Sequence, residues 1–248
     1  MPQVAALWRH PIKSHGREAL EHVTLTAGQT MPWDRRWAVA HEAAKIDGTD
    51  WAPSANFSRG AKVGGLMAID AETDTEQGIV TLRHPDRPDL RFNPEEEQEV
   101  FLDWVKPLMP EKRAQSTRLI RVPDRGMTDT DYPSISLLNL ATNEALEETM
   151  GRDLSISRWR GNIVMEGLLA WQEFDWIGRK LRIGTAELDV QERIERCLAT
   201  ATNPETGERD ADTLGALNKT FGHQDFGIYA TVVASGDIKL GDAVELVE

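Results

Sequence analysis

Short stretches in which apolar and polar residues alternate recur along the whole chain. They are rich in β-branched and aromatic side chains, and turn-forming segments such as PDRPD, NPETGE and ASGD separate them. Alternation with a period of two is typical of strands that bury one face. The pattern predicts strands at residues 3–10, 35–41, 78–84, 117–122, 134–140, 156–165, 179–190, 228–235 and 242–247. So many short strands predict a mainly β protein with a few helices (α+β), built from barrels or sandwiches.

Two segments have the apolar spacing of helices instead. In the first, Asn93 is a candidate N-cap with Pro94 behind it, and the expected apolar face is formed by Val100, Phe101, Trp104, Val105 and Leu108. The second is predicted to run from a Thr142 cap to Gly151, a residue type that favours the position just after a helix. We expect these two helices to pack against the β core.

The segment 110–125 is a candidate linker between two domains, which we expect over residues 1–115 and 116–248. No apolar run approaches the roughly 20 residues that a membrane helix needs. The N-terminus also lacks the pattern of a secretory signal. One cysteine and no signal indicate a reducing compartment, and we expect the cytoplasm.

The formal net charge of −13 argues against non-specific binding to nucleic acid or to an anionic membrane. A local basic pocket remains compatible with this charge. The common catalytic signatures, CxxC, HExxH, GxGxxG and GxSxG, are absent from the sequence. The chemistry must therefore be sought in other residues.

Cys197 is the single cysteine of the chain, and Arg193 and Arg196 precede it closely. A lone intracellular cysteine is most often a small buried apolar residue. Neighbouring guanidinium groups instead favour the thiolate, which is the nucleophilic and metal-binding form. The turn-forming segment that follows places Cys197 near a strand end or loop. One thiolate is too few donors for a protein-only metal site, so another molecule would have to bring most of the ligands.

A second set of residues suits an anionic ligand with many hydrogen-bonding groups. Lys13 and Ser14 end the first strand, and Arg35 and Arg36 precede Trp37. If residues 156–165 form a strand, Arg158, Arg160 and Asn162 project to one face. Arginine and lysine are natural partners of phosphate, and asparagine can both donate and accept toward a heterocycle. Each residue alone is more simply a surface charge, so their joint presence carries the argument.

In these same segments the sequence resembles the MOSC family together with its N-terminal β-barrel domain, the group that includes the amidoxime reducing component. The resemblance covers essentially the whole chain in order, through HPIKSHG, WDRRWAVAH, SISLLNLATNEALEETMG, RWRGNIVM, ERCLATATNPETGERD and FGIYATVVASGDIKLGDAVEL. It implies an N-terminal β-barrel domain over residues 1–115 and a MOSC β-barrel domain over residues 116–248. It also implies a molybdenum–molybdopterin cofactor, and we expect no dependence on pyridoxal phosphate.

The resemblance assigns roles to particular residues. Cys197 is implied as the molybdenum ligand and Tyr229 as a residue near the metal, both at the catalytic centre. The implied cofactor-binding residues are Lys13, Ser14, Arg35, Asn139, Thr142, Arg160, Asn162 and Arg196, although Thr142 also suits a helix cap.

The sequence departs from the family pattern at His10, at Gly161, where proline is usual, and over residues 42–60, which the resemblance places near the substrate entrance. No cysteine-rich ferredoxin-like tail is present, so we expect a separate redox protein as electron donor.

The leading hypothesis is an enzyme that reduces small N-hydroxylated or N-oxide substrates, without a nucleic-acid or membrane partner. The alternatives are a carrier of persulfide sulfur or of the cofactor, and a β-barrel binding module that has lost the cofactor.

Overall fold

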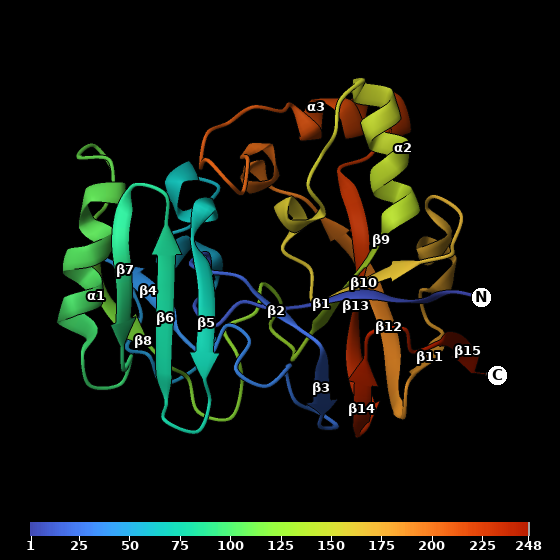
Figure 1. The fold of residues 1–248 in the computed structure, drawn as a ribbon, viewed down its shortest axis with the longest axis horizontal. Coiled ribbons are helices and arrows are strands. Elements are labelled where there is room, and N and C mark those ends of the chain that lie inside the picture. The colour runs from blue at the N-terminus through green and yellow to red at the C-terminus, as the bar shows by residue number, and fades with distance from the viewer. Residues whose placement is uncertain (248) are drawn as a thin grey trace.

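The computed structural model describes residues 1–247. Two lobes lie side by side (Figure 1). One lobe contains β4 to β8 and α1, and the other contains β1, β9 to β15, α2 and α3. The N-terminus and the C-terminal end of the chain lie near each other in the second lobe (Figure 1).

An eight-stranded sheet forms the framework of the second lobe. Its strand order is β15-β11-β12-β13-β9-β10-β1-β2, and β9 and β10 are the parallel pair among antiparallel neighbours. The strands are β1 (Gln3–Arg9), β2 (Glu18–Leu20), β9 (Ile135–Asn139), β10 (Ile163–Glu166), β11 (Lys180–Ile183), β12 (Ala186–Glu195), β13 (Asp225–Ala234) and β15 (Val244–Val247). The antiparallel pair β3 (His22–Leu25) and β14 (Gly236–Lys239) adjoins this sheet. One apolar core, which includes Leu137, Ile163 and Ile228, packs against the sheet.

The first lobe is built from two smaller sheets and one helix. A meander is formed by β5 (Asp70–Asp74), β6 (Ile79–His84) and β7 (Arg87–Phe92), and β4 (Ala38–His41) pairs with β8 (Ser116–Ile120). Helix α1 (Gln98–Val105) buries Phe101 and Trp104, and the Phe101 ring stacks on Phe92 with a centroid distance of 5.4 Å. The lobe therefore has a core of its own.

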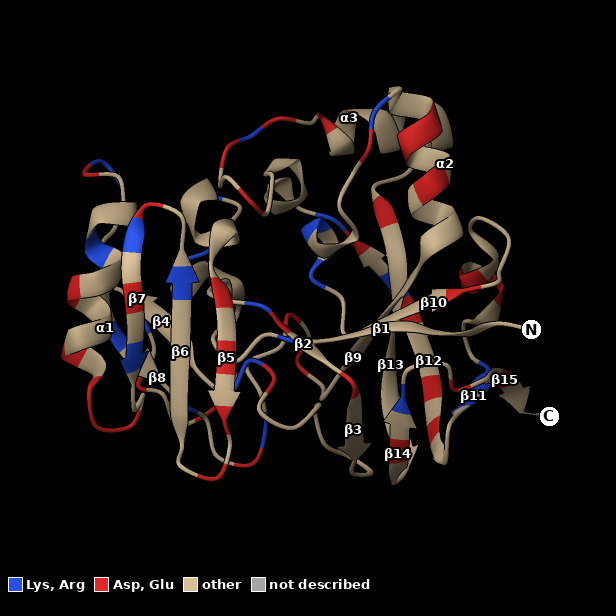
Figure 2. Cartoon of the chain, in the orientation of Figure 1, with Lys and Arg blue, Asp and Glu red and all other residues tan. Residues whose placement is uncertain are grey.

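Helix α2 (Leu140–Met150) follows β9 without a connecting loop. Asn139 is its N-cap, with the side-chain oxygen accepting a hydrogen bond from the Ala141 amide, and Gly151 ends the helix in the left-handed conformation. The short helix α3 (Thr213–Ala216) lies beside α2. Charge is spread over the outer elements, with acidic residues on α1, α2, β5 and β12 (Figure 2).

The predicted fold class, mainly β with a few helices, is confirmed. The helix boundaries needed correction. Asn93 is not the cap of α1, because it lies in a turn where its side chain accepts a hydrogen bond from Glu95 N, and the helix starts only after Glu97. Val100 was expected on the buried face but is 49% exposed. Thr142 lies inside α2, since Asn139 provides the cap three residues earlier.

The prediction of one strand over residues 156–165 was also wrong. Residues Ile156–Trp159 form a 3₁₀ turn, Arg160 has a φ of 49°, and β10 begins only at Ile163. A left-handed residue breaks the alternation of a strand, so Arg158, Arg160 and Asn162 do not share one strand face. The candidate linker 110–125 contains β8, which pairs with β4. In the described part of the chain, no helix has the length and apolarity to span a membrane.

Candidate functional site: a cationic pocket around the single cysteine

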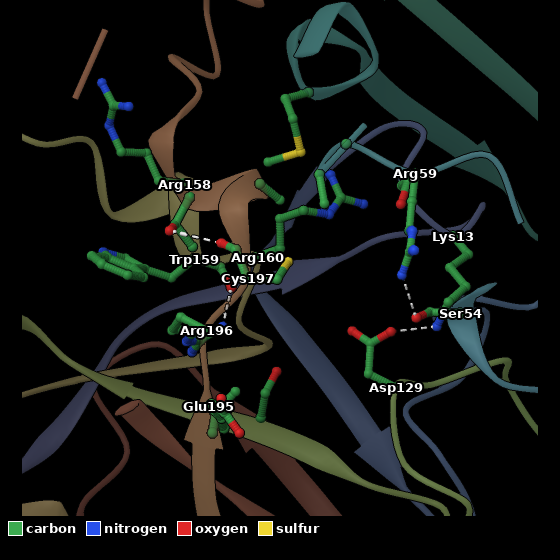
Figure 3. Close-up of a pocket in the computed structure, with 18 of the residues that line it drawn as sticks. Lys13, Ser54, Arg59, Asp129, Arg158, Trp159, Arg160, Glu195, Arg196 and Cys197 are labelled. Atoms are coloured by element: carbon green, nitrogen blue, oxygen red, sulfur yellow. Dashed lines mark hydrogen bonds and ion pairs between the residues drawn. The ribbon is translucent and has the colours of Figure 1, made fainter. Parts of the chain in front are cut away.

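A pocket of about 260 Å³, here called the Cys197 pocket, is lined by residues of both lobes. Figure 3 shows Lys13, Ser54, Arg59 and Asp129 on one side and Cys197 with Arg158, Arg160 and Arg196 on the other. Six cationic side chains line it, against two carboxylates: Lys13, Arg35, Arg59, Arg158, Arg160 and Arg196, against Asp129 and Glu195. The pocket is therefore positive inside an acidic protein.

Most of the residues predicted from the sequence meet in this pocket. Its lining includes Lys13, Ser14, Arg35, Arg160, Arg196, Cys197 and Tyr229. Asn162 is buried beside it in a small cavity that shares Arg35 and Tyr229 with the pocket. There the Asn162 side-chain oxygen accepts from the Ser136 amide and hydroxyl.

Asn139 and Thr142 do not reach the pocket. Both donate to Glu173, with distances of 2.7 Å from Asn139 Nδ2 and 2.9 Å from Thr142 Oγ1 to its carboxylate oxygens. Glu173 is fully buried, and burial raises its pKa. A buried carboxylate needs such donors, so these two side chains are engaged in supporting Glu173 and α2.

Cys197 follows the end of β12 and is exposed, as expected for a residue near a strand end. The thiol is therefore accessible to a ligand in the pocket. Arg193 is not part of this site, because its guanidinium lies 4.3 Å from the centre of the Phe174 ring. No group of three His, Cys, Asp or Glu side chains in residues 1–247 forms a metal site.

Arg196 is held beside the thiol by backbone carbonyls. Its Nε and Nη2 donate to Phe226 O, the former at 2.8 Å, and its Nη1 donates to Trp159 O at 2.8 Å. A side chain at Gly227 would collide with Leu137 O, and its Cβ would lie 3.3 Å from Arg196 Nη2, so glycine keeps this approach open. Burial lowers the pKa of Arg196 to about 10, which leaves the group charged at neutral pH.

Lys13 is buried and donates to Met127 O, Thr128 O and Asp129 Oδ1, at 2.8, 3.0 and 2.6 Å. Burial lowers the pKa of Lys13, and Asp129 opposes that effect. Desolvation disfavours ionised Asp129, but the charges of Lys13 and Arg35 hold its pKa at about 2. Lys13 is thus held in the wall of the pocket by one ion pair and two backbone carbonyls.

Arg35 and Arg160 both line the pocket and are joined by a hydrogen bond. Arg35 Nη1 donates to the buried Asp34 carboxylate, and its Nη2 donates to Arg160 O at 2.9 Å. Burial by itself would lower the pKa of Arg35, but Asp34 and Asp129 raise it. Burial and the charges of Arg35 and Arg17 lower the pKa of Arg160 to about 9.

Arg160 also retains an unused donor. Its Nη1 is buried without a hydrogen-bond partner among residues 1–247. The same is true of Nε and Nη1 of Arg158, which binds Asp210 through Nη2 at 2.8 Å. Unsatisfied buried donors are costly, so an acceptor inside the pocket would be stabilising.

The backbone around these residues is strained. Ser14, Arg35 and Arg160 have φ values of 64°, 48° and 49°, which non-glycine residues rarely adopt. Such conformations cluster at functional sites, where the surrounding structure enforces them. Tyr229 also lines the pocket, and burial raises its pKa well above the usual range, so the hydroxyl remains protonated at neutral pH.

Sequence reasoning missed several pocket residues. Ser54 and Arg59, joined by a 2.9 Å hydrogen bond, come from the segment 42–60, which was predicted to lie near the substrate entrance. Asp129 and Glu195 carried no local signal, because single acidic residues are common in this chain. Only the pairing of Asp129 with buried Lys13, 116 residues away, identifies it.

Curated proteins with related sequences match about half of the chain. A molybdenum cofactor sulfurase of Drosophila ananassae is 32% identical over 140 residues, covering 51% of this chain and 18% of that protein. The mitochondrial amidoxime reducing component 2 of Bos taurus is 29% identical over 126 residues, covering 46% and 37%. The chain therefore spans well under half the length of these relatives.

Two solved structures can be aligned with this chain, one over about half of its length and one over nearly all of it. YiiM from Geobacillus stearothermophilus has 25% identity and a TM-score of 0.38, covering 46% of this chain and 54% of that chain. The YuaD protein from Bacillus subtilis has 12% identity and a TM-score of 0.48, covering 99% and 96%.

Family models match both parts of the chain. The MOSC N-terminal beta barrel domain matches residues 1–106, and the MOSC domain matches residues 125–245. The boundary between residues 115 and 116 lies in the unmatched interval and stays a prediction. The predicted family is confirmed: the chain belongs to the MOSC family and carries the N-terminal β-barrel domain ahead of its MOSC domain.

Proposed function

We propose that this protein binds a molybdenum–molybdopterin cofactor in the Cys197 pocket and reduces small N-hydroxylated or N-oxide substrates. One observation carries the proposal: the only thiol of the chain opens into a pocket with six cations and unused buried donors. The cofactor is anionic through its phosphate and brings sulfur ligands of its own, which suits a site with one protein thiolate.

The pocket residues fit this group by chemistry. Ser14 is the proposed hydrogen-bonding partner of the phosphate, and Arg160 offers the unpartnered Nη1. Lys13 and Arg35 would contribute positive charge toward the phosphate, since the three Nζ donors of Lys13 already bind protein acceptors. Tyr229 lines the pocket itself, where a neutral phenol suits a heterocycle. Buried Asn162, whose amide bonds Ser136 and Trp8 O, would support the adjoining wall. Cys197 is the proposed metal ligand.

The bound cofactor would supply the two-electron redox chemistry of the reduction. The overall reaction consumes two electrons and two protons and releases the substrate oxygen as water. The protein's part is to hold charges in place. Arg196 keeps a cation beside the thiol, and Tyr229 keeps its proton at neutral pH and can act as a donor.

The electrons would come from a separate redox protein. A reducing compartment such as the cytoplasm fits the exposed free thiol.

A second function rests on the same exposed thiol. Cys197 could carry persulfide sulfur, or the protein could hold the cofactor for delivery. The exposure of the thiol and the similarity to proteins named molybdenum cofactor sulfurase favour this alternative.

Metal analysis of protein from a host that makes molybdenum cofactor separates these functions. We expect near-stoichiometric molybdenum and pterin in the wild type. Cys197→Ser should lose molybdenum or all turnover of an amidoxime, with the free energy of unfolding changed by less than about 0.5 kcal/mol because the side chain is exposed. Leu198→Ala is the matched control, since Leu198 is exposed and does not line the pocket.

Wild-type protein without molybdenum or pterin, from a host that loads a control enzyme, would refute the reductase. Persulfide on Cys197 would then favour the sulfur carrier. If Cys197→Ser leaves ligand binding and function intact, the protein is a binding module without the cofactor.

A further inference from the structure

A second pocket, of about 300 Å³, lies beside the same N-terminal segment. We call it the Arg36 pocket, and its lining includes Thr26, Gln29, Trp33, Arg36 and Arg121. Two consecutive arginines line different pockets: Arg35 lines the Cys197 pocket, and Arg36 lines the Arg36 pocket. The proposed cofactor site therefore leaves Arg36 without a role.

Arg36 packs against two tryptophan rings, and no carboxylate of residues 1–247 forms an ion pair with it. Its guanidinium carbon lies 4.5 Å from the centre of the Trp33 ring and 5.4 Å from that of Trp37. Arg36 Nε is buried and has no hydrogen-bond partner within residues 1–247. The two rings, which meet edge to face, restrict the planar group without using its N–H donors.

Arg121 adds a second cation to the pocket. Its Nη1 contacts Glu95 Oε1 at 3.2 Å, but both side chains are more than 40% exposed, so this pair is weak and easily exchanged. Burial and the charge of Arg121 lower the pKa of Arg36, and the nearby Glu95 carboxylate opposes them. Arg125 is a third cation in the lining, but its guanidinium donates to the backbone carbonyls of Thr130 and Asp131. The positive charge of Arg36 and Arg121 is thus incompletely neutralised.

The acidic residues at the pocket do not neutralise this charge. Both oxygens of Asp34 are engaged elsewhere, Oδ1 by the His10 amide at 2.8 Å and Oδ2 by Arg35. Asp124 also lines the pocket, but it is exposed to solvent and forms no hydrogen bond or ion pair with Arg36 or Arg121. Trp33 and Asp124 have φ values of 64° and 62°, so this pocket shares the backbone strain of the first.

We propose that the Arg36 pocket is an accessory binding site for a small oxyanion of the phosphate type, held by Arg36 and Arg121 and separate from the Cys197 pocket. Guanidinium groups bind such oxyanions through paired N–H donors. The Thr26 hydroxyl and the Gln29 amide provide further polar groups in the lining. Trp33 and Trp37 pre-organise Arg36 for the ligand.

Calorimetric titration with inorganic phosphate, at ionic strength held constant with chloride, tests the site. Because phosphate can also enter a cofactor-free Cys197 pocket, variants of each pocket are titrated in parallel. Arg36→Gln and Arg121→Gln address the new site, and Arg59→Gln addresses the other. Arg121→Gln changes an exposed side chain, so it tests the proposal even if Arg36→Gln fails to fold. Arg83→Gln, at an exposed and ion-paired position, is the control for lost surface charge.

We expect saturable phosphate binding that weakens about tenfold in Arg36→Gln and in Arg121→Gln. That component should be unchanged in Arg59→Gln and Arg83→Gln. The proposal is overturned if the wild type shows no saturable binding at roughly 10 mM phosphate. It is also overturned if only Arg59→Gln weakens binding, or if Arg83→Gln weakens it as much as Arg36→Gln and Arg121→Gln do.

Discussion

His10 and His15 lie fully buried next to the cations of the Cys197 pocket. The backbone amide of His10 donates to Asp34, and His15 Nδ1 hydrogen-bonds Lys13 O at 2.8 Å. Burial and the charge of Arg160 lower the pKa of His10 to about 3, and burial lowers that of His15 to about 4. Both rings are therefore neutral in the folded protein at neutral pH, and the His15 ring also holds the backbone carbonyl of Lys13.

These histidines predict how stability depends on pH. The unfolded chain gains their protons below about pH 6.5, whereas the folded chain stays neutral at both positions down to about pH 4. The free energy of unfolding should fall as pH drops from about 6.5 to 4.5, by at most about 1.4 kcal/mol per pH unit for each histidine.

Urea unfolding across this range measures the slope, which His15→Gln should reduce and exposed His22→Gln should not. Equal slopes in all three proteins would contradict the assignment.

Gly161 stands where the family pattern has proline, and the structure explains why this chain needs glycine. A Cβ at residue 161 would lie 2.3 Å from Leu138 Cγ and 2.5 Å from Cδ1. Gly161→Ala should therefore lower the free energy of unfolding by about 1–3 kcal/mol. Gly65→Ala is the control, because nothing lies within 4 Å of its Cβ position. Adding Leu138→Ala should give a double variant that is more stable than the sum of the single effects; strict additivity would refute the clash.

At the junction of β9 and α2, the sequence placed the helix cap at Thr142, whereas the structure has it at Asn139. All five residues of β9 are buried, and its last residue, Asn139, is at once the cap of α2 and a donor to Leu169 O and Glu173. Asn139→Ala should lower the free energy of unfolding by roughly 2–4 kcal/mol, since it removes a cap and a donor to a buried carboxylate.

Molybdenum content per folded protein should not change in this variant. Exposed Thr149→Ala on the same helix is the control, and both are followed by denaturant unfolding and metal analysis. If Asn139→Ala loses cofactor while its free energy of unfolding is unchanged, Asn139 is a cofactor-binding residue after all.

At the scale of the whole molecule, a few contacts hold the lobes together across the pocket. Arg17 Nη1 donates to Met67 O at 2.9 Å and to Pro204 O at 2.7 Å, while its Nη2 binds Asp70 at 2.9 Å. Arg209 Nη2 donates to Ala61 O at 2.8 Å. The turn 203–208, which follows the Cys197 segment, is thus tied to the lobe that contributes Arg59.

Arg17→Leu should loosen this turn without unfolding either lobe. We expect faster hydrogen exchange of backbone amides in residues 203–208, by about fivefold or more, because their anchor to the first lobe is lost. Exchange in β6 should stay unchanged, and Arg83→Leu, at an exposed position, should behave like the wild type. Uniformly faster exchange would instead indicate global destabilisation.

The sequence alone predicted much of the fold, because local alternation and turn residues specify strands. It placed β1, β6, β9 and β13 nearly correctly and located Cys197 at a strand end. It failed at residues 156–165, where Arg160 adopts a left-handed conformation that only its surroundings enforce, among them the hydrogen bond from Arg35 to its carbonyl. The alternation of apolar and polar residues in the sequence does not show where a left-handed residue interrupts a strand.

The sequence by itself determined that the protein is mainly β, that its single thiol follows a strand, and that basic residues of the MOSC pattern recur along the chain. Only the tertiary structure decided which of these residues meet. It joined Lys13 to Asp129, placed Arg59 opposite Cys197, and diverted Asn139 and Thr142 to Glu173. The physical reason is that local propensities act over a few neighbouring residues. Pocket contacts depend instead on strand order and on burial that forces each polar group to find a partner across the fold.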